Sequence, residues 1–125
     1  MIIFVDDEQM VLEMMKIMLS RILSDIEIKT FDCPREAIDF FENNHPKINM
    51  VVSDLTMPNM NGTELLSHLK KINKTTKMGI MSALVQDDKI TGPYDLSNID
   101  FYIPKPSSSQ EIAAILMREY PVKIV

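Results

Sequence analysis

Five polar side chains form a set that could carry out chemistry. Two adjacent carboxylates, Asp6 and Asp7, follow an apolar run, and Asp54 follows another. A hydroxyl, Ser82, and an amine, Lys105, follow two further apolar runs. Three carboxylates brought together repel one another unless a cation lies between them, and Mg²⁺ suits a site with few carboxylates and several waters. Asp54 could then stay ionised as a nucleophile towards phosphorus, while the amine and the hydroxyl contact phosphoryl oxygens.

Each of these residues also has an ordinary structural explanation. An acidic pair after a strand usually forms a turn or caps a helix, and Asp54 before a loop is more often a turn residue. A lone serine says almost nothing. Lys105 would usually be a solvated lysine, but its place between Pro104 and Pro106 restricts its backbone unusually strongly. The combination is therefore far more specific than its parts.

The elements that must position these side chains alternate along the chain. Apolar or alternating runs predict strands at 2–5, 27–31, 50–52, 78–81 and 101–103. Apolar residues at helical spacing predict inner helix faces made of Val11, Met14, Met15, Met18 and Ile22; Ala37, Ile38, Phe40 and Phe41; Leu65, Leu66, Leu69 and Ile72; and Ile112, Ile115, Leu116 and Tyr120. This alternation predicts a parallel sheet with helices on both faces. Ligands bind beyond the carboxyl ends of such strands, so we expect the five polar side chains to converge there.

Local signals mark where several elements begin. Pro34 is well placed in the first turn of a helix. Asn61-Gly62 predicts a turn before the third helix. Ser108, with Glu111 three residues later, resembles a capping box at the start of the last helix.

The segment 84–98 gives the weakest signal. A fourth helix could start near Gln86, but Gly92-Pro93 should end it early. We therefore expect this helix to be short or irregular.

Composition limits the broad class of the protein. The 125 residues, 46% hydrophobic and 25% charged, suit one soluble domain with its own core. The net charge of −5 argues against nucleic-acid binding by this domain itself. A single cysteine, Cys33, no membrane-length apolar run and no basic leader favour a cytoplasmic location. We interpret the eleven methionines as adaptable core filling rather than as a functional sulfur surface.

Nearly the whole chain resembles the CheY-like receiver domain of two-component response regulators. The motifs that carry the resemblance are Val5-Asp6-Asp7-Glu8, Ser53-Asp54-Leu55-Thr56-Met57-Pro58-Asn59-Met60-Asn61-Gly62, Met81-Ser82-Ala83 and Tyr102-Ile103-Pro104-Lys105-Pro106. The resemblance implies a flavodoxin-like (βα)5 three-layer sandwich with a five-stranded parallel sheet in the order 2-1-3-4-5. It also implies one receiver domain over residues 1–125, possibly cut from a longer protein.

The resemblance assigns roles around the acidic cluster. It makes Asp54 the acceptor of a phosphoryl group from a histidine kinase or phosphotransfer protein, and pairs Lys105 with that group. Asp7 would bind Mg²⁺ (or Mn²⁺) directly, Asp6 would act through a metal-bound water, and the Thr56 backbone carbonyl would complete the protein ligands together with the acceptor itself.

Further positions would control the switch and its lifetime. Ser82 and Tyr102 match the pair that changes packing when the phosphoryl group arrives, and Thr56 and Leu84 match positions that tune the lifetime of the acyl phosphate. The Lys105–Pro106 bond is expected to be cis. The domain would assist its own phosphorylation and dephosphorylation rather than act as an enzyme on other substrates, and would signal to a downstream output domain or protein.

The sequence departs from the family pattern in the region of the fourth helix and fifth strand. Thr91-Gly92-Pro93 interrupts the helix, Asn98-Ile99-Asp100 replaces a usual Gly-Ala, and Ser107 stands where phenylalanine is common. This region often forms the dimer face in the family, so the usual dimer is not assumed.

Two alternatives belong to other functional classes. A receiver-like module could bind proteins independently of phosphorylation, although the intact acidic set argues against it. A haloacid-dehalogenase-type phosphatase would need an Asp-x-Asp pattern and a cap domain, whereas Asp54 is followed by Leu55-Thr56. The apolar tail 122–125 suggests a hypothesis of its own: it leads into a further domain or packs against a partner.

Overall fold

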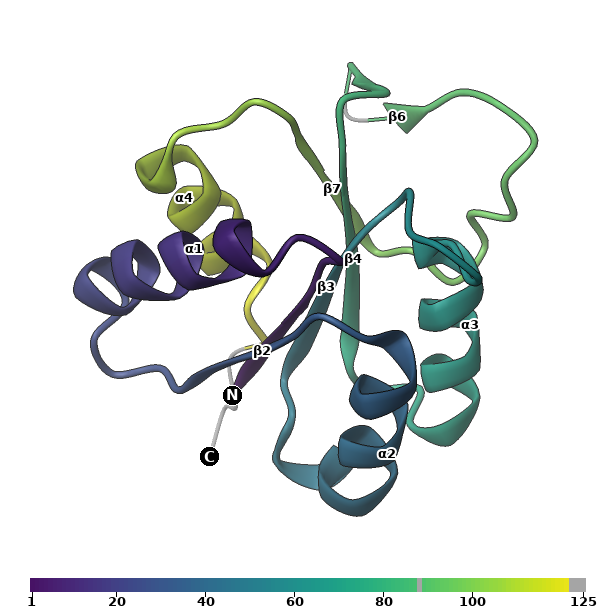
Figure 1. Ribbon diagram of the computed structural model, residues 1–125, viewed down its shortest axis with the longest axis horizontal. Helices are drawn as coiled ribbons and strands as arrows, with labels where there is room; N and C mark the ends of the chain where they lie inside the picture. Colours follow the sequence, from purple (N-terminus) through teal and green to yellow (C-terminus); the bar gives the residue numbers. More distant parts are fainter. Residues whose placement is uncertain (88, 122–125) are drawn as a thin grey trace.

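A computed structural model describes residues 1–87 and 89–121. Its centre is a sheet of five parallel strands in the order β2-β1-β3-β4-β7 (Figure 1). The strands are β1 (Ile2–Val5), β2 (Ile28–Phe31), β3 (Met50–Asp54), β4 (Lys77–Ser82) and β7 (Phe101–Pro104). Since β7 is the fifth strand of this sheet in chain order, the predicted order 2-1-3-4-5 is confirmed.

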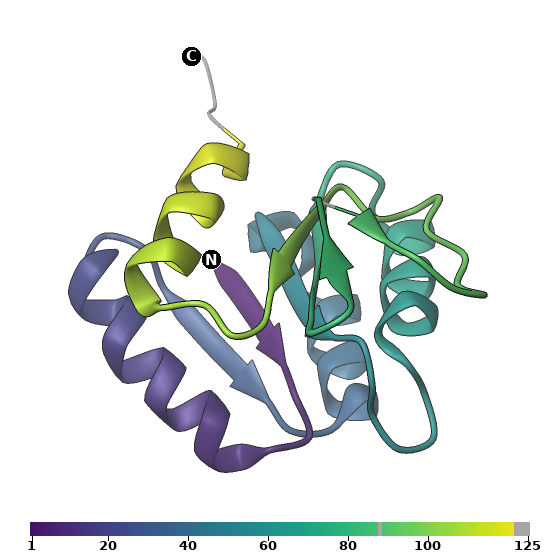
Figure 2. The same cartoon turned by 90° about the horizontal axis from the view of Figure 1, so that it is seen from above.

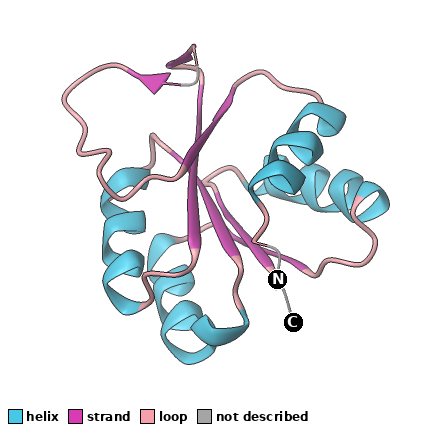
Figure 3. Ribbon diagram, turned by 180° about the vertical axis from the view of Figure 1, so that it is seen from behind, coloured by secondary structure: helices cyan, strands magenta, loops and turns pink. Residues whose placement is uncertain are grey.

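Helices cover both faces of the sheet and complete a three-layer sandwich. Figure 1 and the reverse view in Figure 3 show α1 (Gln9–Ile22) and α4 (Ser109–Glu119) on one face, and α2 (Pro34–Asn44) and α3 (Gly62–Ile72) on the other. A short 3-10 helix, η1 (His45–Lys47), follows α2. Within the described ranges no helix is long and apolar enough to cross a membrane.

The side chains of β1 divide the interior into two cores. Ile2 and Phe4 pack towards α1 and α4, whereas Ile3 and Val5 pack towards α2 and α3. Successive residues of a strand point to opposite faces of a sheet, so a continuous apolar run is what a central strand of a three-layer fold requires.

The helix starts follow local chemistry. Pro34 is the first residue of α2, and the capping box at Ser108 is confirmed, because its hydroxyl accepts from the Glu111 N–H at 3.1 Å. Asn61 does more than end a loop. It is the N-cap of α3, and its side chain accepts from the Glu64 N–H at 3.0 Å in a second capping box.

The inner face predicted for α1 is largely wrong. Leu12 and Leu19 are the buried residues of this helix, whereas Met14, Met18 and Ile22 are exposed. Apolar residues occur nearly all round α1, so their spacing did not single out a face.

The methionines divide between core and surface. Four are buried (Met50, Met57, Met78, Met81) and four are exposed (Met10, Met14, Met18, Met117). Core filling therefore describes only part of the set.

The segment between β4 and β7 also differs from expectation. Gln86 lies in a strand rather than a helix: β5 (Val85–Gln86) pairs antiparallel with β6 (Lys89–Ile90), and the described residues between β4 and β7 form no helix. Asp87 has a φ of 51° and Gly92 a φ of 130°, both incompatible with a continuous helix. The hairpin is anchored by Ile90, which is buried in the core under α2 and α3. The tail 122–125, for which a further domain or a partner was expected, lies outside the described residues.

Candidate functional site

Three carboxylates meet beyond the carboxyl ends of β1 and β3. Asp6, Asp7 and Asp54 each offer an oxygen, and these oxygens all lie within 4.8 Å of one another. Asp6 is buried, Asp7 is exposed and Asp54 is half-buried, so the cluster opens to solvent from one side. Hard oxygen donors at this separation fit a cation such as Mg²⁺.

Lys105 supplies a positive charge to the same cluster. Its Nζ lies 3.1 Å from Asp54 Oδ1 and 3.5 Å from Asp6 Oδ2. Burial acts to lower the pKa of Lys105, but the hydrogen bond and charge of Asp54, with the charge of Asp6, outweigh it and raise the pKa above its ordinary value. The ammonium therefore stays charged next to Asp54.

Asp6 experiences opposing influences. Burial is the largest and raises the pKa of its carboxyl, and the nearby charge of Asp54 acts in the same direction. The Glu8 N–H donates to Asp6 Oδ1 at 3.0 Å and Lys105 lies close by, and both act to lower the pKa. The net result is a raised pKa, which is the behaviour expected of a buried carboxyl held close to another carboxylate.

Strand register brings these residues together. Val5 pairs with Ser53, so Asp6 follows its strand beside Asp54. Further along the sheet Asp54 pairs with Met81. Ser82 pairs with Pro104, the residue before Lys105. The Ser82 carbonyl accepts a hydrogen bond from the Lys105 N–H at 3.0 Å. Residues about fifty positions apart in sequence thus become neighbours through parallel pairing.

Two residues beside Asp54 were not assigned a role from the sequence. A side chain at Gly62 would collide with the carbonyl oxygen of Asp54, and the Gly62 N–H donates to the Leu55 carbonyl at 2.8 Å. Ser53 is fully buried, and its hydroxyl donates to the Asp54 carbonyl at 2.9 Å. Ser53 therefore holds the backbone of Asp54, and Gly62 leaves room for it. A glycine directly after the N-cap of a helix was the available signal, but close backbone approach is a tertiary property.

The remaining predicted residues make no described contact with the Asp54 carboxylate. Ser82 is buried, and its hydroxyl accepts from the Leu84 N–H at 3.0 Å. Tyr102 is half-buried and packs against the core under α2 and α3, and burial raises its pKa. The side chains of Thr56 and Leu84 are exposed. The Lys105–Pro106 bond is cis, as predicted.

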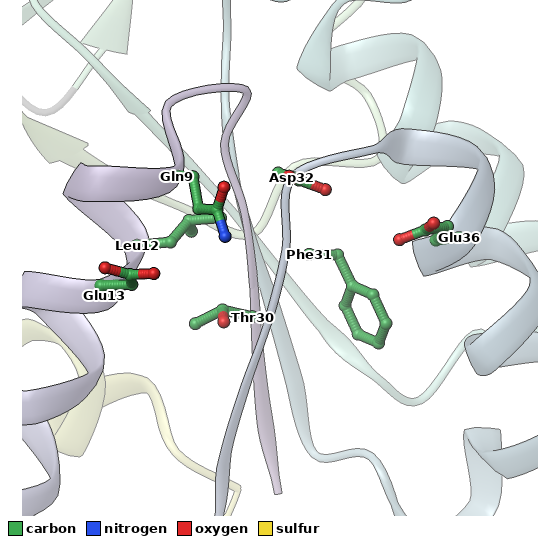
Figure 4. A pocket seen from close by; sticks show the side chains of 7 residues that line it. All are labelled: Gln9, Leu12, Glu13, Thr30, Phe31, Asp32 and Glu36. Atoms are coloured by element: carbon green, nitrogen blue, oxygen red, sulfur yellow. The ribbon is translucent and has the colours of Figure 1, made fainter.

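A separate hollow lies between α1 and the β2–α2 connection (Figure 4). Figure 4 shows carboxylates from three segments around it; its lining is Gln9, Leu12, Glu13, Thr30, Phe31, Asp32 and Glu36. Neither Asp54 nor Lys105 lines it. The chemistry predicted from the sequence therefore belongs to the aspartate cluster and not to this hollow.

Comparison with known families decides the class of the protein. The profile of the family described as response regulator receiver domain matches residues 2–117. The chain belongs to this family. Receiver domains are signalling domains of two-component systems, and they bind Mg²⁺ at an aspartate cluster of the kind formed here by Asp6, Asp7 and Asp54.

Curated relatives agree with this assignment. The receiver domain is 34% identical over 113 residues to the probable transcriptional regulator ycf27 of Porphyridium aerugineum, covering 90% of this chain and 45% of the relative. It is 29% identical over 121 residues to the response regulator protein VraR of Staphylococcus saprophyticus, covering 95% of this chain and 56% of the relative. The chain thus spans about half the length of these relatives.

Solved structures share the receiver fold. A response regulator receiver domain from Clostridium thermocellum superposes with a TM-score of 0.77 at 22% identity, covering 94% of this chain and 91% of that one. A chain of the CheX-CheY-BeF3-Mg²⁺ complex from Borrelia burgdorferi gives a TM-score of 0.77 at 22% identity, covering 94% of this chain and 86% of that one. At this identity the likeness concerns the fold alone.

Proposed function

We propose that Asp54 accepts a phosphoryl group from the phosphohistidine of a histidine kinase or phosphotransfer protein. The observation that carries this proposal is the placement of the Lys105 ammonium 3.1 Å from Asp54 Oδ1, within a cluster of three carboxylates. A carboxylate flanked by a fixed cation is a nucleophile whose attack on phosphorus is electrostatically assisted.

The transfer is a displacement at phosphorus. An oxygen of Asp54 forms a bond to phosphorus as the bond to the donor imidazole nitrogen breaks, and the electron pair of that bond leaves with the imidazole. The Lys105 ammonium, which contacts the Asp54 carboxylate before the transfer, can contact a phosphoryl oxygen after it. Positioning and charge neutralisation are most of what this reaction requires of a protein.

Asp6, Asp7, Asp54 and the backbone carbonyl of Thr56 are the residues that would hold Mg²⁺ or Mn²⁺. When bound, the ion neutralises the carboxylates and the developing charge on the phosphoryl oxygens. Asp7 is the exposed member of the cluster and would bind the ion directly, whereas the buried Asp6 would act through a water. Asp6 is in turn oriented by the Glu8 N–H.

The switch would begin at Ser82. Its hydroxyl accepts from the Leu84 N–H in this state, and it would turn to donate to a phosphoryl oxygen on Asp54. Movement of Ser82 would allow Tyr102, half-buried in the neighbouring core, to change its packing. Thr56 and Leu84, which are both exposed, would tune the lifetime of the acyl phosphate.

The domain would act within a larger signalling pathway. Residues 1–125 form one receiver domain in this proposal, and the greater length of the relatives supports a downstream output domain or protein. The net charge of −5 argues against nucleic-acid binding by the domain itself.

The test is the intact mass of the chain after incubation with acetyl phosphate and Mg²⁺. We expect a labile gain of one phosphoryl group that does not form when Mg²⁺ is omitted and does not form in Asp54→Ala. Asp39→Ala, which removes an exposed carboxylate from α2, is the matched control and should keep the gain. If neither acetyl phosphate nor beryllofluoride modified the wild-type chain, the alternative of a phosphorylation-independent binding module would replace this proposal.

A further inference from the structure

Helix α1 carries an apolar surface on the outside of the molecule. Its exposed fractions are high for large hydrophobic residues: Met10 78%, Met14 61%, Ile17 56%, Met18 43% and Ile22 42%. Figure 2 shows α1 along one outer edge of the domain, with no other described element beyond it. Isolated surface hydrophobics need no explanation, but five on one helix form a continuous patch.

The exposed residues fall on two neighbouring ridges of the helix. Met10, Met14, Met18 and Ile22 recur every four residues and form one ridge. Glu13, Ile17 and Arg21 form the adjacent ridge, with opposite charges one turn before and one turn after the isoleucine. We call these two ridges the α1 face.

We propose that the α1 face binds the α1 face of a second copy of this chain, with the two helices antiparallel about a twofold axis at Ile17. A twofold contact is isologous, so a residue four positions before Ile17 faces the residue four positions after it in the other copy. Glu13 of each copy then lies opposite Arg21 of the other, and Ile17 lies opposite itself. The charges of one ridge are therefore complementary to the same ridge turned through 180°.

Other features of the α1 face fit this occupant. Glu13 and Arg21 form no ion pair with any residue in the ranges 1–87 and 89–121, so their charges are free to pair across an interface. The unbranched side chains of Met10, Met14 and Met18 adapt readily to an opposing surface.

The size of the face is also suitable. Its five apolar side chains expose on the order of 500 Å², at the upper end for a monomer, and a polar rim would bring it near the roughly 800 Å² per partner of a standard interface. The segment between β4 and β7, by contrast, folds as a short hairpin followed by a loop and offers no comparable helix face within the described residues.

The test measures self-association of the chain by sedimentation over a range of concentrations, without phosphoryl donor. We expect a monomer–dimer equilibrium. Ile17→Glu should raise the dissociation constant at least about tenfold, because it places like charges on the axis. Glu13→Arg and Arg21→Glu should each weaken the dimer, since each places like charges opposite one another, and the two together should restore it.

Lys16→Glu is the matched control. It changes the net charge by the same amount as Arg21→Glu but lies beside Ile17 on the side away from the methionine ridge, so the dimer should persist. Far-UV circular dichroism checks that each variant is folded. If Ile17→Glu is unfolded, the charge-reversal variants at Glu13 and Arg21 test the proposal by themselves. A wild-type chain that stays monomeric, a dimer insensitive to these changes, or no recovery in the double reversal would each overturn the proposal.

Discussion

Two regions at the carboxyl ends of the strands are built in different ways. The aspartate cluster takes its residues from the ends of β1, β3 and β7, which backbone pairing holds in register. The segment after β4 is shaped by turns, with Asp87 and Gly92 at positive φ and with strands of only two residues in its hairpin. The arrangement of the cluster therefore depends on the sheet. The connection after β4 forms a hairpin in place of the expected helix without disturbing the cluster.

The largest expected effect is on the phosphorylation rate, and it tests whether the aspartate cluster depends on the Lys105 ammonium. Lys105→Ala should slow phosphorylation by acetyl phosphate by about 100-fold or more, as loss of a group aimed at developing charge commonly does. The measurement is the initial rate of mass gain. Lys70→Ala is the control, because Lys70 also pairs with a carboxylate, Asp100 at 2.8 Å, but lies outside the cluster. Equal loss of rate in both variants would contradict a specific role for Lys105.

A pair of glycine substitutions separates the two regions. Gly62→Ala should lower the free energy of unfolding by about 2–3 kcal/mol and also slow phosphorylation, because the new methyl group meets the Asp54 carbonyl. Gly92→Ala should lower the free energy of unfolding by about 1 kcal/mol, because an alanine is strained at the φ of 130° that Gly92 adopts. It should leave the phosphorylation rate unchanged. Denaturant unfolding and the phosphorylation rate are the two measurements. Slowed phosphorylation in folded Gly92→Ala would show that the two regions are coupled.

The smallest effect concerns the buried acid. The pKa of Asp6 is raised above 3.8 in the folded chain, so its contribution to stability is present below that pH and is lost as the pH rises through the folded-state pKa. In the presence of a chelator, Asp6→Asn should therefore be more stable than wild type at neutral pH, and this gain should vanish below pH 3.8. Thermal unfolding at several pH values measures it. An unchanged gain at low pH would exclude ionisation of Asp6 as the cause.

Predictions from the sequence were most successful where a local pattern is compatible with a single structure. Four continuous apolar runs and one alternating run placed the five strands of the sheet, and Pro34 and Ser108 located two helix starts. The convergence of Asp6, Asp7, Asp54 and Lys105 followed from strand order alone, because parallel strands end at the same edge.

It failed where several structures were locally acceptable. Helix α1 has apolar residues on most sides, so the sequence could not show that Leu12 and Leu19 point inward while Met14 and Met18 face solvent. That choice depends on which residues meet β2 and α4 in the folded chain. Gln86 was similarly placed at a possible helix start, although it lies in a hairpin held by burial of Ile90.

The sequence by itself determined the alternation of strands and helices, the family and the identity of the clustered acids and lysine. These features follow from residue types and their spacing, which can be recognised within a few neighbouring positions of the chain. The tertiary structure alone decided the distance from Lys105 to Asp54, the close approach of Gly62 to the Asp54 carbonyl and the outward face of α1. These depend on packing between segments far apart in the chain, and local sequence patterns carry no direct record of that packing.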